Sequence, residues 1–223
     1  MNNKLKNYAM SLMLGMGLVG IAAPAQAADD MSVYADIGAF SQYIFRGAAQ
    51  GLDASGNGTA SLQGDVGIEH ESGLSANVWF ATGVNGAAGS GKETEFDFTV
   101  DYSGEAGDIG YSVGYIAYVY TDSTLDVNEF YIGGSYDIAS ATAYISDTYN
   151  YIELSAGDTV ADMFDASVAV GVFSPDVGTS TTHITLGASK DFDMGSYTLS
   201  PSMTAGKAGD LGAEFAMGVN ASF

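Results

Sequence analysis

Residues 93–102 read Glu-Thr-Glu-Phe-Asp-Phe-Thr-Val-Asp-Tyr, so acidic and apolar side chains take turns along the chain. The acids are Glu93, Glu95, Asp97 and Asp101, and the apolar residues between them include Phe96, Phe98 and Val100. A period of two is the period of a β-strand, whose side chains point alternately to its two faces. The sequence therefore predicts a strand with one acidic and one apolar face.

The last residues of the chain show the same alternation. Between 211 and 223, every second side chain is apolar or small, and the run ends with Phe215, Met217, Val219, Ala221 and Phe223. This ending looks like the assembly signal that outer-membrane barrels present to their insertion machinery, although Ala221 is a small residue where a larger one is common. We predict that these five residues form a barrel-assembly signal.

Ten more segments are predicted to be strands by the same count, which gives twelve strands in all. They are residues 32–47, 62–69, 74–80, 109–120, 127–136, 141–147, 149–156, 164–173, 181–190 and 195–206. Ten strands remain an alternative, because 141–156 can be one bent strand and Ile116 falls on the wrong face of its strand. Mostly longer connections (48–60, 85–92, 121–126, 174–180) alternate with short ones (71–73, 104–108, 137–140, 191–194), as in outer-membrane barrels.

The first 27 residues have the organisation of a secretory signal peptide. Lys4 and Lys6 precede an apolar stretch over 9–23, which is followed by Ala25-Gln26-Ala27. The apolar stretch is shorter than the roughly 20 residues that a membrane-spanning helix needs. We therefore expect cleavage after Ala27 and a single domain over residues 28–223.

Charge and composition exclude several classes of protein. The predicted domain contains four Lys and Arg residues and 27 Asp and Glu residues, so its net charge is −23. Nucleic acid is excluded as a partner, because phosphate binding needs clustered basic residues. The chain has no cysteine, which excludes a disulfide-stapled fold, and the predicted domain contains no apolar run of membrane-helix length.

Alternation alone is also compatible with a soluble β-sandwich, which buries one face of each strand. The export signal, a final strand that ends at an aromatic residue and aromatic residues near strand ends favour a membrane barrel instead. These aromatic residues are Tyr43, Phe45, Tyr118, Tyr120, Phe130, Tyr131, Phe173, Phe192 and Phe223. The predicted fold is all-β: a closed antiparallel up-and-down transmembrane barrel with long outer loops and short periplasmic turns.

Residues 41–47 (Ser-Gln-Tyr-Ile-Phe-Arg-Gly), together with Gln50, Gln63-Gly64 and 69–74 (Glu-His-Glu-Ser-Gly-Leu), resemble the TorF-like porins of proteobacteria, a Gly-Cys-Trp-motif family. The resemblance is strongest over 31–82 and extends more loosely to the C-terminus. The family has a Gly two positions before a Trp, whereas this chain has Asn77 before Trp79. The resemblance implies an outer-membrane location and a pore, and it names no substrate.

In a membrane barrel the acidic faces must point inward, because each carboxylate facing hydrocarbon costs roughly 1–3 kcal/mol. Ten residues are therefore predicted to line a pore, and Asp36 and Glu153 are also expected to point inward. The ten are Arg46, Asp65, Glu69, Trp79, Glu93, Glu95, Asp97, Asp101, Glu129 and Glu214. Arg46 is expected at the outer rim of the first strand, in a plain salt bridge or a constriction, and Trp79 and Tyr118 are candidates to plug the bore.

An acidic tube enriches cations, so the sequence predicts a porin that passes cations or small polar solutes by passive diffusion. The alternatives are that the acids are merely solvated on loops, or that the barrel is a non-conducting structural or loop-displaying protein. No enzymatic activity, cofactor or metal site is predicted: alternation points His70 away from Glu69 and Glu71, and His183 lacks the partners of a triad. The expected partners are outer-membrane lipid, lipopolysaccharide, the barrel-insertion machinery and small solutes or cations.

Overall fold

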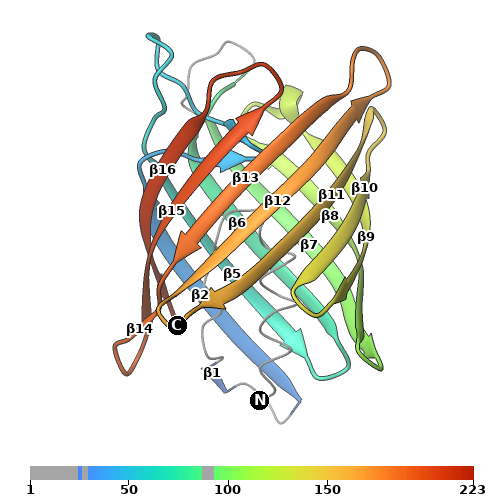
Figure 1. The fold of residues 1–223 in the computed structure, drawn as a ribbon, viewed down its shortest axis with the longest axis vertical. Helices are drawn as coiled ribbons and strands as arrows, with labels where there is room; N and C mark the ends of the chain where they lie inside the picture. The colour runs from blue at the N-terminus through green and yellow to red at the C-terminus, as the bar shows by residue number, and fades with distance from the viewer. Residues whose placement is uncertain (1–24, 27–29, 87–92) are drawn as a thin grey trace.

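The structure is a computed structural model that describes residues 25–26, 30–86 and 93–223. Its main feature is one antiparallel sheet whose twelve long strands close into a barrel (Figure 1). Each long strand pairs with its neighbours in the sequence, and β2 (Met31–Phe40) pairs with both β5 (Ser61–His70) and β16 (Glu214–Ser222). The predicted twelve-stranded closed barrel is confirmed, and the sandwich alternative is wrong.

Nine further long strands complete the barrel. They are β6 (Leu74–Val84), β7 (Glu93–Ala106), β8 (Ile109–Tyr120), β9 (Val127–Tyr136), β10 (Ala139–Ile145), β11 (Tyr149–Val160), β12 (Phe164–Pro175), β13 (Thr181–Ser189) and β15 (Thr198–Ala208). The short elements are β1 (Ala25–Gln26), β3 (Ile44–Phe45), β4 (Ala48–Ala49), β14 (Phe192–Asp193) and the 3-10 turn η1 (Ser123–Leu125). In the part of the chain that the structure describes, no helix is long and apolar enough to cross a membrane.

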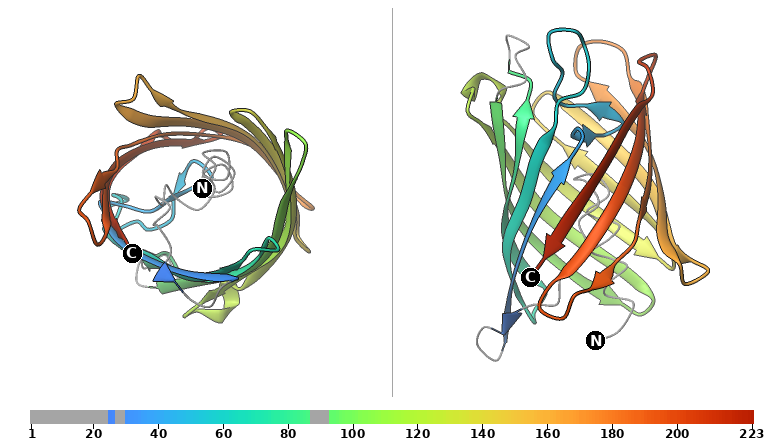
Figure 2. Two further views of the ribbon diagram at one scale, coloured as in Figure 1. Left: turned by 90° about the horizontal axis from the view of Figure 1, so that it is seen from below. Right: turned by 90° about the vertical axis from the view of Figure 1, so that its left-hand side faces the viewer.

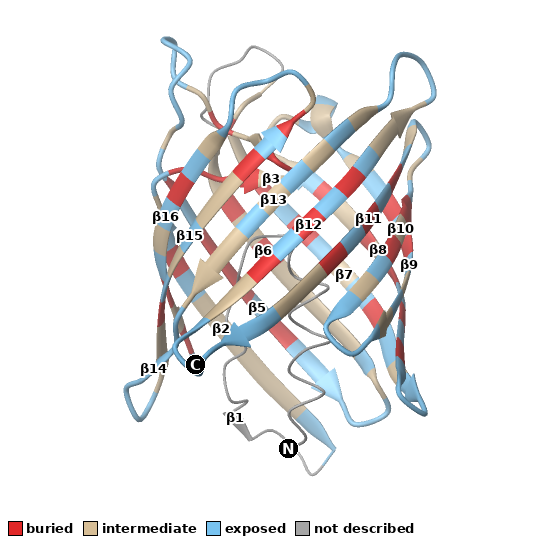
Figure 3. Ribbon diagram, viewed as in Figure 1, coloured by how far each residue is buried: buried red, intermediate tan, exposed pale blue. Residues whose placement is uncertain are grey.

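Buried and exposed residues alternate along most strands, as Figure 3 shows by colour. On β7, Glu95 and Asp97 are buried, whereas Phe96 and Phe98 between them are exposed on the outer face. On β16 the large apolar side chains are again the exposed ones: Phe215 is 70% exposed and Met217 is 67% exposed. The barrel therefore has a polar interior and an apolar outer surface, the reverse of a water-soluble protein.

The prediction of one strand over 32–47 is wrong beyond Phe40. Strand β2 ends there, and the chain leaves the barrel wall and folds back as the short β3–β4 pair before it returns in β5. The composition of residues 43–45, which are apolar or aromatic as in a strand, explains the error. In the structure, Gly47 has a φ of 77°, and this conformation ends an extended segment.

The aromatic residues near strand ends do not all face outward. Phe130, Phe192 and Phe223 are exposed, whereas Tyr43 and Tyr131 are buried inside the barrel. Tyr118, which the sequence also placed inward, is buried too. An aromatic residue satisfies the two-residue period on either face, so the period alone does not assign it to the lipid side.

Two uncertain strands are resolved by the pairing. Residues 141–156 belong to two antiparallel strands, β10 and β11, so the ten-stranded alternative is wrong. Ile116 does lie on the inner face, where it packs in a buried cluster with Tyr118 and Tyr131. The interior is thus partly aromatic and apolar, which is why one apolar residue breaks the alternation of β8.

Two sequence predictions fall largely outside the described residues. The signal peptide covers 1–27, of which the structure describes Ala25 and Gln26, paired with β2. The predicted loop 85–92 is described only to Gly86. The C-terminus lies at the lower rim of the barrel in Figure 1, the rim that carries the turn after β5.

Replacing Val219 by Arg should impair folding into lipid. Val219 is 41% exposed on the outer face, so the charge would meet hydrocarbon and cost about 2–4 kcal/mol near the bilayer midplane. Urea titration of the variant in lipid vesicles, with heat-modifiable migration on gels as the test of barrel formation, measures the loss. The matched change Asn220→Arg places the charge on the acidic inner face and should cost less; equal losses would contradict the assignment of faces.

Candidate functional site

The interior of the barrel holds a hairpin that the strand pattern did not anticipate. The connection 41–60 between β2 and β5 carries β3 and β4, which lie inside the ring of strands in the view along the barrel (Figure 2). Arg46 and Gly47 form its tip with φ values of 47° and 77°, the left-handed pair that a tight hairpin turn requires. We call residues 43–49 the inner hairpin.

The tip of the inner hairpin lies against β15 and β13. A Cβ atom on Gly47 would be 2.5 Å from the backbone oxygen of Lys207 on β15 and 3.0 Å from that of Ile184 on β13. A Cβ atom on Gly206 would likewise meet Ile44 at 2.8 Å. Glycine at these positions therefore allows the hairpin to lie directly on β15, which is two strands from β2 in the sheet.

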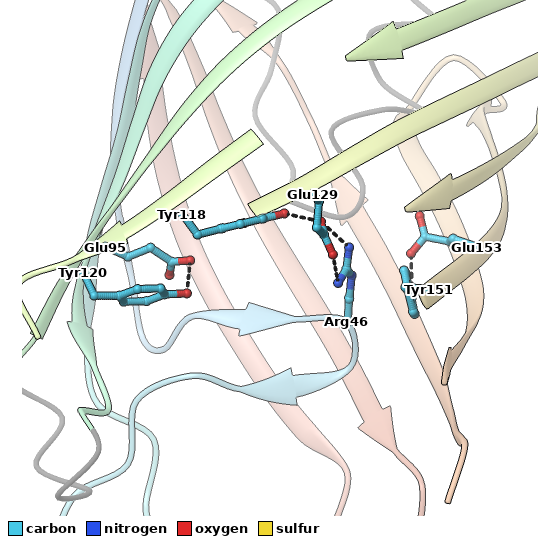
Figure 4. A network of polar contacts seen from close by, with 7 residues as sticks. All are labelled: Arg46, Glu95, Tyr118, Tyr120, Glu129, Tyr151 and Glu153. Atoms are coloured by element: carbon cyan, nitrogen blue, oxygen red, sulfur yellow. Dashed lines mark hydrogen bonds and ion pairs between the residues drawn. The ribbon is translucent and has the colours of Figure 1, made fainter. Parts of the chain in front are cut away.

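Arg46 at the hairpin tip forms a buried ion pair with Glu129 on β9 (Figure 4). Its Nη1 donates to Glu129 Oε1 at 2.7 Å and its Nη2 donates to Oε2 at 2.9 Å, a bidentate geometry. The two side chains are 6% and 0% exposed. The prediction that Arg46 lies at the outer rim is therefore wrong, because the chain turns inward after Phe40.

Aromatic rings surround the guanidinium group of Arg46. Its Cζ lies 4.0 Å from the ring centre of Tyr151 and 4.7 Å from those of Tyr144 and Phe45. Such contacts add cation–π attraction, which is strongest where water is excluded. The ion pair and these rings together fix the hairpin tip to β9, β10 and β11.

The base of the inner hairpin packs on the wall through rings as well. Tyr43 lies 5.3 Å from Trp79 on β6, and Phe45 lies 6.2 Å from Tyr118 on β8, between ring centres. Trp79 is 1% exposed as a result. A cavity of about 20 Å³ remains beside Tyr43 and Ile44 toward β15, which is room for about one water molecule.

Tyrosine hydroxyl groups donate to four of the interior carboxylates. The pairs are Tyr118 to Glu129 at 2.7 Å, Tyr120 to Glu95 at 2.7 Å, Tyr131 to Asp101 at 2.5 Å and Tyr151 to Glu153 at 2.9 Å. A neutral donor stabilises a carboxylate without cancelling its charge. Glu129 alone among these four also pairs with a basic side chain, so the other three keep a negative charge whenever they are ionised.

The remaining sequence-predicted site residues lie on the same inner face but at different heights. Asp65 accepts from Asn77 at 2.8 Å, Glu93 accepts from the Thr121 hydroxyl, and Glu214 accepts from Gln42 at 3.2 Å. Asp97 is 1% exposed, whereas Glu69 near the lower rim is exposed. The structure thus brings Arg46 and Glu129 together and leaves the other acids spread along the wall.

The fully buried acidic residues lie on one side of the interior, whereas Asp36 on β2 and Glu214 on β16 are partly exposed. The buried carboxylates lie on β5, β7, β9 and β11: Asp65, Glu95, Asp97, Asp101, Glu129 and Glu153. From β12 to β16, the buried polar residues are neutral: Ser167, Ser200, Asn220 and Ser222. Within the described ranges, no group of three or more His, Cys, Asp or Glu residues is placed to hold a metal ion.

Sequence reasoning missed the inner hairpin and the tyrosine donors. The hairpin did have a signal, since Arg46-Gly47 follows an aromatic run and interrupts an otherwise long strand. Tyr118, Tyr120, Tyr131 and Tyr151 follow the inward period of their strands, so their inner position was available from spacing. Their pairing with particular carboxylates depends on the strand register, which cannot be read from the spacing of residues in the sequence.

The family model described as "Bacterial protein of unknown function (Gcw_chp)" matches residues 24–199. The chain belongs to the Gcw_chp family.

No curated protein matches it. Among solved structures, the Gcw_chp barrel is similar to the KdgM porin, with a TM-score of 0.60 and 9% identity over 85% of this chain and 99% of that one. It is also similar to the KdgM porin in complex with disordered oligogalacturonate, with a TM-score of 0.61, 9% identity and the same coverage. These likenesses establish the porin-like fold of the Gcw_chp chain.

Replacing Glu129 by Gln should destabilise the Gcw_chp barrel by about 3–5 kcal/mol, because Arg46 would remain buried without a counter-charge. Urea titration in lipid vesicles measures the free energy of unfolding. Glu93→Gln, a change near the rim, should cost less than about 1 kcal/mol. Combining Arg46→Met with Glu129→Leu should restore most of the loss. A single Glu129→Gln variant as stable as the parent would show that the ion pair does not hold the hairpin.

Proposed function

We propose that this chain is an outer-membrane porin whose interior favours small cations. The observation that carries the proposal is a closed barrel with an apolar outer face and an interior where buried carboxylates outnumber basic side chains. The porin-like fold shared with the KdgM structures supports the channel part of the proposal. The proposal includes export through a signal peptide cleaved after Ala27 and assembly guided by the strand that ends at Phe223.

Cation preference follows from the charges on the inner wall. Arg46 is the basic side chain buried there, and Glu129 neutralises it. Glu95 and Asp101 accept hydrogen bonds from neutral tyrosine hydroxyl groups, and Asp97 Oδ1 has no hydrogen-bond partner among the described residues. The negative field of these three acids is therefore not cancelled by a basic side chain. A low-dielectric tube concentrates that field, which attracts cations and repels anions. The pore-lining role of these acids is part of the proposal.

The resemblance to TorF-like porins agrees with a channel, and we propose that relationship as well. Oligogalacturonate, which the KdgM porin binds in one structure, is a chain of acidic sugars and does not fit this interior. A polyanion would meet the repulsive field of the carboxylates on β5, β7 and β11. Small cations and small neutral polar solutes are the class that fits the interior.

A second candidate function is a non-conducting barrel that supports the envelope or displays loops. One observation favours it: the inner hairpin crosses the interior and is fixed at its tip by the Arg46–Glu129 ion pair. A hairpin held this firmly narrows the bore. Transport and occlusion therefore make opposite predictions for the same measurement.

Purified barrel in planar bilayers should give discrete conductance steps, and a salt gradient should give a reversal potential of the sign that marks cation selectivity. Charge screening predicts that the selectivity weakens at high salt, since the Debye length falls from about 10 Å at 0.1 M to about 3 Å at 1 M. Complete absence of conductance would favour the structural barrel. Anion selectivity would contradict the role given to the carboxylates.

Shortening the inner hairpin should widen the bore of the barrel through which solutes would pass. Replacing residues 43–49 by a short Gly/Ser turn removes the rings on Trp79 and Tyr118 and the tip that meets β15, so single-channel conductance should rise about twofold or more. Asp210→Asn, in an exposed turn outside the hairpin, leaves the hairpin intact and is the control. Equal conductance of the parent and the shortened barrel would show that the hairpin is not the narrowest point.

A further inference from the structure

Four carboxylates surround the ring of Tyr34 on the inner wall, below the inner hairpin. Tyr34 lies on β2 with Asp36 two residues further along the same face, and it is directly opposite Gly67 on β5. Asp65 and Glu69 flank Gly67 at two residues on either side. Gly67 is in turn opposite Asn77 on β6 and Asn77 is opposite Thr99 on β7, so Asp101 lies two residues further along the same face of β7.

Gly67 makes room for the Tyr34 ring on the wall. A Cβ atom on Gly67 would lie 2.3 Å from Tyr34 Cζ and 2.4 Å from its hydroxyl oxygen, so the ring occupies the space of the missing side chain. The ring therefore lies over β5, and Tyr34 remains partly exposed. Aromatic faces attract cations within about 6 Å of the ring centre.

The four acids fall into two pairs, one on each side of the ring along the barrel. Asp36 and Asp65 are directly opposite each other in the register of β2 and β5. Glu69 and Asp101 are both directly opposite Ser75 of β6, one from each neighbouring strand. Asp65 and Glu69 are four residues apart, so the two pairs are separated by about 13 Å along the strand.

The acids that are hydrogen-bonded have neutral partners. Asn77 donates to Asp65 Oδ2, and Tyr131 donates to Asp101. Asp65 is 8% exposed, and its second oxygen, Oδ1, has no hydrogen-bond partner among the described residues. Like charges directly opposite on neighbouring strands are unfavourable. The Asp36–Asp65 pair therefore holds a buried acceptor that no described residue satisfies, next to a second acidic side chain.

The arrangement fits an organic cation better than a metal ion. A metal ion needs several oxygen ligands within about 2.0–2.6 Å, and the described residues present no such group. An alkylammonium group supplies both the charge and the N–H donors that carboxylates accept, and its methylene groups can lie on the ring. Two acidic pairs with an aromatic face between them match a chain that carries several spaced ammonium groups.

We infer that Tyr34, Asp36, Asp65, Glu69 and Asp101 form a binding site for linear polyamines such as spermidine. One end of the polyamine meets Asp36 and Asp65, the middle lies over Tyr34, and the other end meets Glu69 and Asp101. This inference names a solute class for the cation-favouring porin and so rests on the proposed function. The binding itself needs no open bore.

Trp79 reports on this site, because it is the only tryptophan of the chain and lies directly opposite Asp65 in the register of β5 and β6. Spermidine added to the detergent-folded barrel at constant ionic strength should change the Trp79 emission and saturate. Neutral 1,4-butanediol should produce no saturable change. The Asp36→Asn/Asp65→Asn double variant should weaken the response about tenfold or more, since charge-assisted hydrogen bonds are lost.

Further variants test the ring and guard against misfolding. Tyr34→Leu removes the aromatic face and should weaken binding about fivefold, whereas Tyr34→Phe keeps it and should remain within about twofold. Asp210→Asn, in the exposed turn before β16, should bind like the parent. Heat-modifiable migration identifies the folded variants, so any change is assigned only to closed barrels.

Failure of the site and failure of the pore give different results. If the barrel conducts cations but spermidine causes no saturable change in Trp79 emission, the polyamine site is wrong and the porin proposal stands. If the barrel does not conduct but the response saturates and is lost in the Asp36→Asn/Asp65→Asn variant, the site stands and the porin proposal fails. A response that is the same in all variants overturns the site.

Discussion

The pairing of β2 with both β5 and β16 is the constraint on which the rest of the structure depends. Once the first and last long strands join, every long strand has two neighbours and the sheet has no open edge. A sheet without an edge meets the requirement of lipid, which offers no hydrogen bonds to exposed backbone groups. Closure also creates an inside, and the two faces of each strand must then differ in chemistry.

The inside that closure creates is filled unevenly. The buried carboxylates lie on β5, β7, β9 and β11, whereas the buried polar residues of β12 to β16 are neutral. The inner hairpin touches β15 through Gly47, and its Arg46 side chain reaches β9. Arg46 neutralises Glu129, and no other buried carboxylate among the described residues is given a basic partner. One ion pair thus positions the hairpin while the wall around it keeps a negative field.

Tyrosine side chains supply the hydrogen bonds that allow carboxylates to be buried in this interior. Hydroxyl groups of Tyr118, Tyr120, Tyr131 and Tyr151 satisfy carboxylates that would otherwise lack donors. Two of these rings find room on the wall over a glycine of a neighbouring strand: Gly114 lies beneath Tyr131, and Gly171 beneath Tyr151. The same pairing of glycine and aromatic ring places Tyr34 on Gly67, close to four acidic residues in the strand register.

The sequence by itself determined the barrel, its twelve strands and the inner position of the acids of β7. These follow from a local period of two, which any observer can count along residues such as Glu93 to Tyr102. Only the tertiary structure decided that β2 stops at Phe40, that Arg46 meets Glu129 and that Tyr34 lies among four carboxylates. Those outcomes depend on strand register and on a turn with left-handed backbone, which bring together residues as far apart as 46 and 129. A periodic pattern fixes which face a side chain occupies, whereas its partner is fixed by which strand lies beside it and at what height.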